Sequence, residues 1–138
     1  MLSVEEYIRP AVCNGHPREQ ALIRRWWYEA HGARGRLFWE YHLDGCYLDA
    51  LWMPDADDHG TELPGTEAPK AFAIDGVPVI LCEAKLRLSP ELIGQALVYG
   101  VLARRFGAQV RSTVIFAEVA RPPLKMAAEE LGLEVVVV

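Results

Sequence analysis

An apolar run that ends in an acid and a lysine places the strongest constraint on how this chain can fold. Residues Val79–Cys82 are apolar, follow the turn signal Asp75-Gly76 and lead directly into Glu83-Ala84-Lys85. A short apolar run bounded by turn residues is typical of a strand that is buried on both faces. Alternation along the strand directs Glu83 and Lys85 to the same side. Charged groups in such a place must be paired, bound to a metal or open to a cleft, so we expect a functional site there.

The length and composition predict one domain in a cytoplasmic setting. The chain has 138 residues, 51% of them hydrophobic and 24% charged, which is enough to bury a core without staples. Its three cysteines have neither paired nor metal-type spacing, which favours reduced thiols. We expect no signal peptide and no membrane span, because no basic-then-apolar start and no apolar run of about 18 residues is found. The expected parts are a domain over 1–138, a helical extension over 1–16 and a mobile loop over 54–69.

Helix start and stop signals predict four helices. Ser3-Val4-Glu5-Glu6 is a capping box that opens the first helix, and Pro17 and Gly32 bound the second. Ser89-Pro90 supplies an N-cap and a first-turn proline for the third helix, which ends at Gly107. The expected helices span residues 4–12, 17–30, 90–106 and 122–131.

Turn signals between apolar runs predict the strands. Asp44-Gly45 separates two alternating runs and indicates a hairpin. Asp75-Gly76 is expected to close a second tight hairpin, which leads from residues 71–74 into the strand that carries Glu83. The helix at 90–106 joins two neighbouring strands, so we predict an α/β fold: a mixed central β-sheet flanked by helices on both faces. The expected strands span residues 36–43, 46–53, 79–85, 111–118 and 133–138, the last of them buried.

Strict alternation predicts which side chains of the first hairpin share a face. On the first strand it groups Tyr41 with Trp39, and on the second strand it groups Leu48 with Ala50. Glu40 then lies at an exposed-type position, and we interpret it as a surface residue.

Two acids form the first part of a candidate site. Asp49 lies on the strand that closes the first hairpin, one hairpin upstream of Glu83. Neighbouring strands would bring these two acids together as like charges, which repel unless a cation or a proton intervenes. Gln95 and Tyr99, one helical turn apart on the next helix, form the pattern Gln-x-x-x-Tyr.

The type and order of these residues resemble the PD-(D/E)XK nuclease superfamily, and the Gln-x-x-x-Tyr pair resembles its RecB-like branch. The resemblance covers about residues 17–118 and implies a restriction-endonuclease-like αβββαβ core. It also implies a metal-dependent nuclease, which hydrolyses phosphodiester bonds in nucleic acid. The residues that match the superfamily's site positions are Asp49 and Glu83 for the metal-binding acids, Lys85 for the catalytic lysine, and Glu19 for an acid that some branches carry on the first core helix.

Mg²⁺ or Mn²⁺ is the expected cofactor. Mg²⁺ favours oxygen ligands and keeps several waters, so the carboxylates of Asp49 and Glu83 with the Ala84 carbonyl would suffice. Such a metal lowers the pKa of a bound water and neutralises charge on phosphoryl oxygens. Lys85 would orient the attacking water or stabilise the developing oxyanion, and the Gln-x-x-x-Tyr pair would position the water or a phosphate.

Two departures from the superfamily pattern bear on the metal site. Leu48, and not a proline, precedes Asp49. A literal Pro-Asp pair does occur at Pro54-Asp55, so Asp55 is a rival for the metal role. We favour Asp49, because it lies inside a strand that can hold a ligand rigidly, whereas Asp55 opens a loop.

Each site residue also has an ordinary alternative. Glu83 and Lys85 alone would be interpreted as an ion pair at a strand end, Tyr99 as a core residue and Glu19 as a solvated acid in the first turn of a helix. The four histidines show no spacing of the His-x-x-x-His type, so a zinc site is not expected.

Nucleic acid, and DNA in particular, is the expected partner. The net charge of −5 argues against a general nucleic-acid binder, although acids around a metal site add negative charge that bound cations offset. Clustered arginines are the candidate contacts, with solvated helix ends and loops as the ordinary alternative. These arginines are Arg34, Arg36, Arg104 and Arg105.

Two other functions stay open on the sequence. One is a catalytically inactive nuclease-like domain that binds nucleic acid or a protein partner, which the small size and acidic balance favour. The other is a structural or assembly partner that binds no divalent cation. A homodimer is also open, with the apolar strand at 135–138 as one candidate contact.

Overall fold

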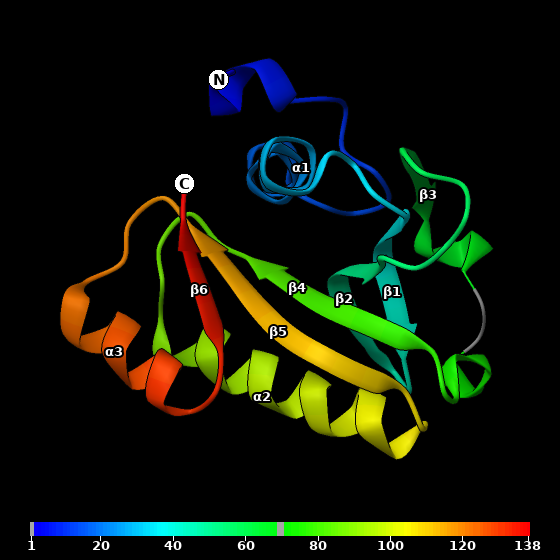
Figure 1. Ribbon diagram of the computed structural model, residues 1–138. Helices are drawn as coiled ribbons and strands as arrows, with labels where there is room; N and C mark the ends of the chain where they lie inside the picture. The colour runs from blue at the N-terminus through cyan, green and yellow to red at the C-terminus, as the bar shows by residue number, and fades with distance from the viewer. Residues whose placement is uncertain (1, 69–70) are drawn as a thin grey trace.

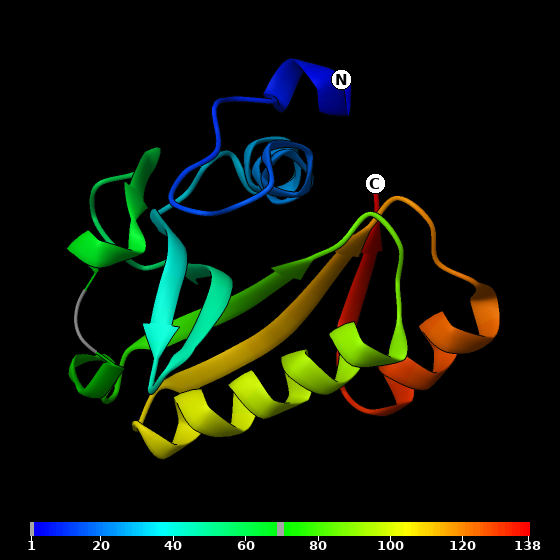
Figure 2. The same ribbon diagram turned by 180° about the vertical axis from the view of Figure 1, so that it is seen from behind.

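The protein folds into a six-stranded mixed β-sheet with helices on both faces, which confirms the predicted α/β class (Figure 1). The computed structural model describes residues 2–68 and 71–138. The strands follow the order β3-β1-β2-β4-β5-β6 across the sheet. Helix α1 covers one face, and α2 and α3 cover the other (Figures 1 and 2). The elements are α1 (Pro17–His31), β1 (Arg36–Leu43), β2 (Cys46–Met53), β3 (Thr61–Pro64), β4 (Pro78–Ala84), α2 (Pro90–Arg105), β5 (Gln109–Ala117), α3 (Pro122–Glu130) and β6 (Glu134–Val137).

The hairpin of β1 and β2 is confirmed at both of its ends. Arg36 pairs with Met53 at the open end, and Leu43 pairs with Cys46 beside the turn. Asp44 and Gly45 have positive φ angles of 46° and 86°. A two-residue turn of this kind matches the right-handed twist of the strands that it joins.

The unit β4–α2–β5 also follows the prediction. β4 pairs antiparallel with β2 and parallel with β5, so α2 is the crossover that two parallel neighbours require. The helix begins after Ser89, whose Oγ accepts the Leu92 N–H at 3.2 Å, and it ends at Arg105, within two residues of Gly107.

The N-terminal helix is shorter than the predicted span of 4–12. A single 3-10 turn, η1, covers Val4–Tyr7, and Ile8 is already extended with φ −69° and ψ 129°. The prediction neglected Pro10, which cannot donate an N–H and disfavours helical backbone at the residue before it. The Ser3 N–H does donate to Glu6 Oε2 at 2.7 Å, as the capping box predicts.

The segment before β4 differs from the prediction in two places. The loop predicted over 54–69 contains the edge strand β3, parallel to β1, and a 3-10 turn, η2 (Gly65–Glu67); its last residue lies outside the described residues. A strand of four residues with a proline is too short to show a periodicity. The tight hairpin predicted through residues 71–77 is wrong, because Ala71–Ile74 form a 3-10 turn, η3, and the Gly76 N–H bonds to the Gly107 carbonyl at 2.8 Å.

The last strand is not buried as predicted. β6 pairs with β5 on one side only and forms an edge of the sheet. Val135 is 8% exposed, whereas Val137 is 49% exposed. The run of four valines at residues 135–138 therefore reflects an edge strand with one packed face. Composition alone does not distinguish such a strand from a central, fully buried one.

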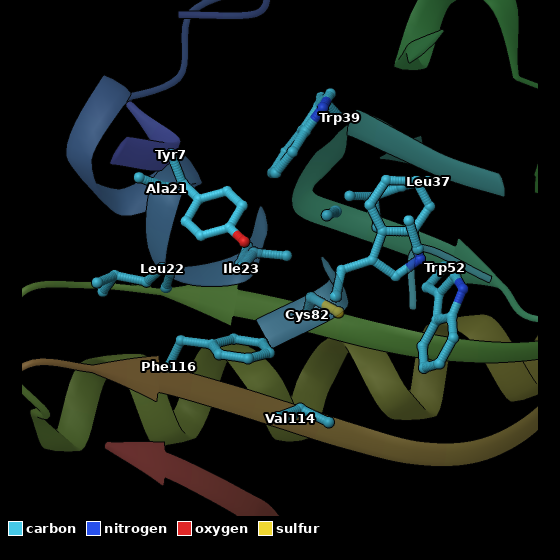
Figure 3. Close-up of a cluster of buried hydrophobic side chains, with 14 of the residues drawn as sticks. Tyr7, Ala21, Leu22, Ile23, Leu37, Trp39, Trp52, Cys82, Val114 and Phe116 are labelled. Carbon is cyan, nitrogen blue, oxygen red and sulfur yellow. The ribbon is translucent and has the colours of Figure 1, made fainter. Parts of the chain in front are cut away.

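Three groups of buried side chains fill the two faces of the described sheet, and one of them combines residues of α2, β5, α3 and β6. The group on the α1 face, here the α1-side cluster, combines apolar residues of α1 with inward-facing residues of the strands (Figure 3). The α2-side cluster lies on the other face, against α2. The labelled members of the α1-side cluster are Tyr7, Ala21, Leu22, Ile23, Leu37, Trp39, Trp52, Cys82, Val114 and Phe116 (Figure 3).

Across the described residues, none of the helices has both the length and the apolar character that crossing a membrane requires.

Candidate functional site

The structure brings Asp49 and Glu83 together on the neighbouring strands β2 and β4. The backbone pairing of these strands runs from Trp52 and Ile80 to Ala50 and Cys82. Beyond that point side chains take over the hydrogen bonding. The Ala84 N–H donates to Asp49 Oδ2 at 2.8 Å, and the Asp49 N–H donates to Glu83 Oε1 at 3.2 Å. Both carboxylates are therefore held by backbone donors at the place where the ladder opens.

A reversal of side-chain direction in β1 and β2 creates this opening. Trp39 packs in the α1-side cluster but Tyr41, two residues on, packs in the α2-side cluster. Ala50 and Leu48 differ in the same way on β2. The change occurs at Glu40, whose φ of 55° lies in the left-handed region. The prediction of unbroken alternation through the hairpin is therefore wrong at one point, and that point faces Asp49.

Gly65 packs against the reversed backbone of β1. A Cβ placed on Gly65 would lie 2.1 Å from the Glu40 carbonyl oxygen and 2.6 Å from the Trp39 carbonyl oxygen. Only a glycine lets the chain after β3 approach β1 this closely. The segment predicted to be a loop thus packs directly against β1 at the residues where the side-chain direction reverses.

Burial and mutual repulsion perturb both acids. Glu83 is 3% exposed. Its burial, reinforced by the negative charge of Asp49, raises the pKa of Glu83 far above the usual range of a carboxyl group. Burial likewise raises the pKa of Asp49, against the opposing effect of the Ala84 N–H. Two buried acids in contact favour either a shared proton or a bound cation.

Two further acids lie beside Asp49 around a small cavity. The cavity of about 20 Å³ is lined by Asp49 and Ala84, by Glu40 of β1 and by residues of α1 that include Glu19. A cavity of this size has room for about one water molecule. The structure thus places Glu19, which belongs to α1, beside Asp49 of the sheet at the predicted site.

Sequence reasoning missed Glu40. It is half-buried, and burial followed by the charge of Asp49 raises the pKa of Glu40. The signal was available, because a two-residue turn that pairs Leu43 with Cys46 also sets Glu40 opposite Asp49. Glu40 was assigned to the surface because a polar residue that alternates with apolar residues along a strand was assumed to face solvent.

The remaining predicted residues lie at different depths. Lys85 is exposed just after the end of β4, and its charge acts to lower the pKa of Asp49 and of Glu83. Among the residues that the structure describes, no ion pair joins Lys85 to an acid. Tyr99 packs against the α2-side cluster, where burial and then the charge of Glu83 raise the pKa of its hydroxyl to about 12. Gln95 is exposed on the preceding turn of α2.

Asp55, the rival for the metal role, is engaged elsewhere. Its two carboxylate oxygens accept bonds from Arg111 at 2.7 Å and from Arg34 at 2.8 Å. Arg111, more than any other group, holds the pKa of Asp55 below its usual range. Two arginines therefore already neutralise this acid.

The predicted nucleic-acid contacts separate into two regions. Arg34 pairs with Asp55, and Arg36 makes a bidentate pair with Asp58 whose shortest contact is 2.6 Å. Arg104 and Arg105 are exposed in the last turn of α2. The first two arginines thus fasten the loop that follows β2.

The donor set suits a cation that needs few protein ligands. Over residues 2–68 and 71–138, no three His, Cys, Asp or Glu side chains are close enough to hold a metal together. Mg²⁺ is commonly bound by one or two carboxylates, with waters completing its shell. Asp49 and Glu83 fit that pattern, since they are two adjoining oxygen donors and, within the described residues, neither forms an ion pair with a basic side chain.

No protein-family model, curated protein or solved structure matches this chain.

Proposed function

We propose that this protein is a Mg²⁺- or Mn²⁺-dependent nuclease of the PD-(D/E)XK type with a restriction-endonuclease-like core. The observation that carries the proposal is the contact between two buried acids, Asp49 and Glu83, at the point where the ladder between β2 and β4 opens. A buried pair of like charges is costly to maintain. A divalent cation between them would turn that cost into binding energy.

The element order supports the same assignment. The helix α1, the strands β1, β2 and β4, the helix α2 and the strand β5 follow one another as in the αβββαβ core, with β3 inserted before β4. Asp49 lies on β2, Glu83 lies on β4, and Lys85 follows directly after β4. The Ala84 carbonyl would complete the ligand set for the metal, which when bound supplies an acidified water and neutralises charge on the phosphate.

The chain's own residues would orient the reaction. Lys85 is exposed beside the acids, where its ammonium can reach a phosphate oxygen or the attacking water. Glu19 and Glu40 line the small cavity beside Asp49 and would fix the position of bound water there by hydrogen bonds. Tyr99 packs on the α2 side of the sheet, close enough for the charge of Glu83 to raise the pKa of its hydroxyl, and that hydroxyl would hold Glu83 in place.

A cleavage assay tests the proposal. Purified protein should cut labelled single-stranded or double-stranded DNA or RNA with Mn²⁺ or Mg²⁺, and EDTA should stop the reaction. Glu83→Gln keeps the shape of the side chain but not its charge, and should lower the rate at least about 100-fold, as should Lys85→Ala. Lys125→Ala is the matched control, because Lys125 is a surface lysine on α3 that pairs with Glu129.

Cleavage that survives both Glu83→Gln and Lys85→Ala would remove the proposal. The second candidate function is a catalytically inactive nuclease-like domain that binds nucleic acid or a protein, and the nearly complete burial of Glu83 favours it. Calorimetric titration with Mn²⁺ distinguishes the two. Metal binding that depends on Asp49 and Glu83 supports the nuclease, whereas nucleic-acid binding without metal binding or cleavage supports the inactive domain.

A further inference from the structure

A second cavity lies on the α2 face of the sheet. It has a volume of about 140 Å³ and lies between α2, β5 and the turn that follows α3. α2 and α3 are neighbours on this face (Figures 1 and 2). The cavity shares no lining residue with the one beside Asp49. It is therefore a separate feature of the fold, and we call it the α2–α3 cavity.

A guanidinium and a hydroxyl converge in the α2–α3 cavity above a glycine of α2. The position of a Cβ built on Gly100 is 3.2 Å from Arg104 Nη1 and 3.5 Å from Thr113 Oγ1. All three residues line the cavity. Because Gly100 has no side chain, the space between the two polar groups stays open. Alanine would be the better helix former there, but its methyl group would occupy that space.

Neither polar group has a partner in the described parts of the chain. Thr113 is only 5% exposed, and its hydroxyl takes part in none of the side-chain hydrogen bonds found there. The Thr113 oxygen is not among the described buried side-chain atoms that lack a partner, so the hydroxyl keeps access to solvent through the cavity that Thr113 lines. Arg104 likewise forms no ion pair within residues 2–68 and 71–138. A guanidinium and a hydroxyl that lie beside the same open space, with no partner among the described residues, thus point to a ligand with acceptor oxygens.

The charge of the cavity wall agrees with an anionic ligand. None of the ten described lining residues is an acid, whereas two are arginines. Arg111 is already held by Asp55, which leaves Arg104 as the cation for a ligand. Glu134 of β6 acts on His31 and Cys82, which belong to the α1 face, so its charge lies on the other side of the sheet.

We propose that the α2–α3 cavity binds a phosphate group. The Arg104 guanidinium would pair with two phosphate oxygens in its usual fork geometry. The Thr113 hydroxyl would donate to a third oxygen. The phosphate group belongs either to a small phosphate compound or to a nucleic-acid backbone, and the second source rests on the proposed nuclease function.

Titration with inorganic phosphate, followed by amide chemical shifts in NMR spectra, tests the cavity itself. The wild-type protein should show saturable shifts at Gly100, Thr113 and Gly132. Arg104→Gln should weaken binding about 10-fold or more, and Thr113→Val, which keeps the shape of the side chain, several-fold. Arg105→Gln is the matched control, because it removes the same charge one residue away at a side chain outside the cavity lining. Thermal unfolding of each variant checks that it is folded.

Two outcomes of this titration would overturn the proposal. One is the absence of saturable shifts in the wild-type protein. The other is an equal loss of affinity in Arg105→Gln and Arg104→Gln, which would indicate general charge attraction. Neither outcome depends on cleavage activity, so failure of the nuclease proposal leaves this test intact.

A second measurement identifies the source of the phosphate. Fluorescence anisotropy with a labelled oligonucleotide in EDTA reports nucleic-acid binding without cleavage. If the ligand is a nucleic-acid phosphate, Arg104→Gln should weaken binding and lower the salt-dependence slope by about 1, and Thr113→Val should weaken it with no change of charge. If phosphate binding is lost in both variants but oligonucleotide affinity is unchanged, the cavity binds a small phosphate compound.

Discussion

Replacing Gly65 by alanine tests whether the contact between η2 and β1 maintains the reversal at Glu40. The φ of Gly65 is not positive, so its backbone accepts an alanine without strain. At such positions Gly→Ala usually stabilises a protein by about 0.4–1 kcal/mol through the unfolded state. Any loss of stability must therefore come from the contact alone.

The contact distances predict a substantial loss. The new methyl carbon would lie 2.1 Å from the Glu40 carbonyl oxygen, where ordinary contact begins near 3.4 Å. The two segments must separate by about 1 Å, and the atoms in the way are backbone, which cannot rotate aside. Overpacking of this kind costs about 1–3 kcal/mol. The free energy of unfolding should thus fall, against the usual sign for this substitution.

Gly94→Ala provides the matched control. Gly94 is exposed within α2, and a Cβ built on it meets no atom within 4 Å. This variant should gain about 0.5–1 kcal/mol. Urea unfolding of both variants measures the difference, provided that the urea dependence of the unfolding free energy stays equal to that of the wild type.

The same variant connects the reversal to the proposed metal site. A shift of β1 at Glu40 is transmitted to Asp49 on the paired strand, and with it to the 2.8 Å bond to Ala84. Mn²⁺ affinity, measured by calorimetry, should fall about 10-fold or more, in the range seen when the support of a metal ligand is removed. Equal or greater stability of Gly65→Ala would refute the contact argument. Lower stability with unchanged Mn²⁺ affinity would refute the role of the reversal in positioning Asp49.

Three further predictions concern buried polar groups. The pKa of Glu83 is higher in the folded protein than in the unfolded chain, so above about pH 4.5 the folded state holds a proton that the unfolded state has lost. The free energy of unfolding of the metal-free protein should therefore fall as pH rises above about 4.5, by at most about 1.4 kcal/mol per pH unit. Urea unfolding between pH 5 and 9, in EDTA, should show this slope in the wild type and lose it in Glu83→Gln; a flat wild-type profile would contradict the assignment. Glu62→Ala leaves the charge of Arg24, which is 3% exposed, unpaired in the core, and should lower the free energy of unfolding by about 3 kcal/mol. Asp58→Ala removes an exposed ion pair and should lower it by no more than about 1 kcal/mol. Equal urea midpoints for the two variants would show that the buried pair contributes no more than the exposed one. Tyr41→Phe removes a buried hydroxyl that, among the described side chains, lacks a hydrogen-bond partner, so thermal unfolding should show equal or higher stability, and a drop of several degrees would reveal an unrecognised partner.

Local sequence signals predicted the elements that depend on local chemistry. The bounds of β1 and β2 follow from the Asp44-Gly45 turn, and the start of α2 follows from Ser89-Pro90. The contact between Asp49 and Glu83 was also predictable, because hairpin connectivity makes their strands neighbours. Some errors fell where a short element or a single residue departs from a period, as in the strand Thr61–Pro64. Others fell where a turn signal was misinterpreted, as at Asp75-Gly76.

The sequence by itself determined which residues carry charge at the ends of buried strands, the sign of the net charge and the order of the longer helices and strands, without β3. These are properties of neighbouring residues, and their physical rules act over one or two turns of chain. The tertiary structure decided which charges meet. Contact with a glycine distant in sequence accompanies the reversal at Glu40, and only the packing of α1 on the sheet brings Glu19 to Asp49. Arg34 from the loop before β1 and Arg111 from β5 both pair with Asp55, because pairing energies depend on distance and burial, which no linear spacing encodes.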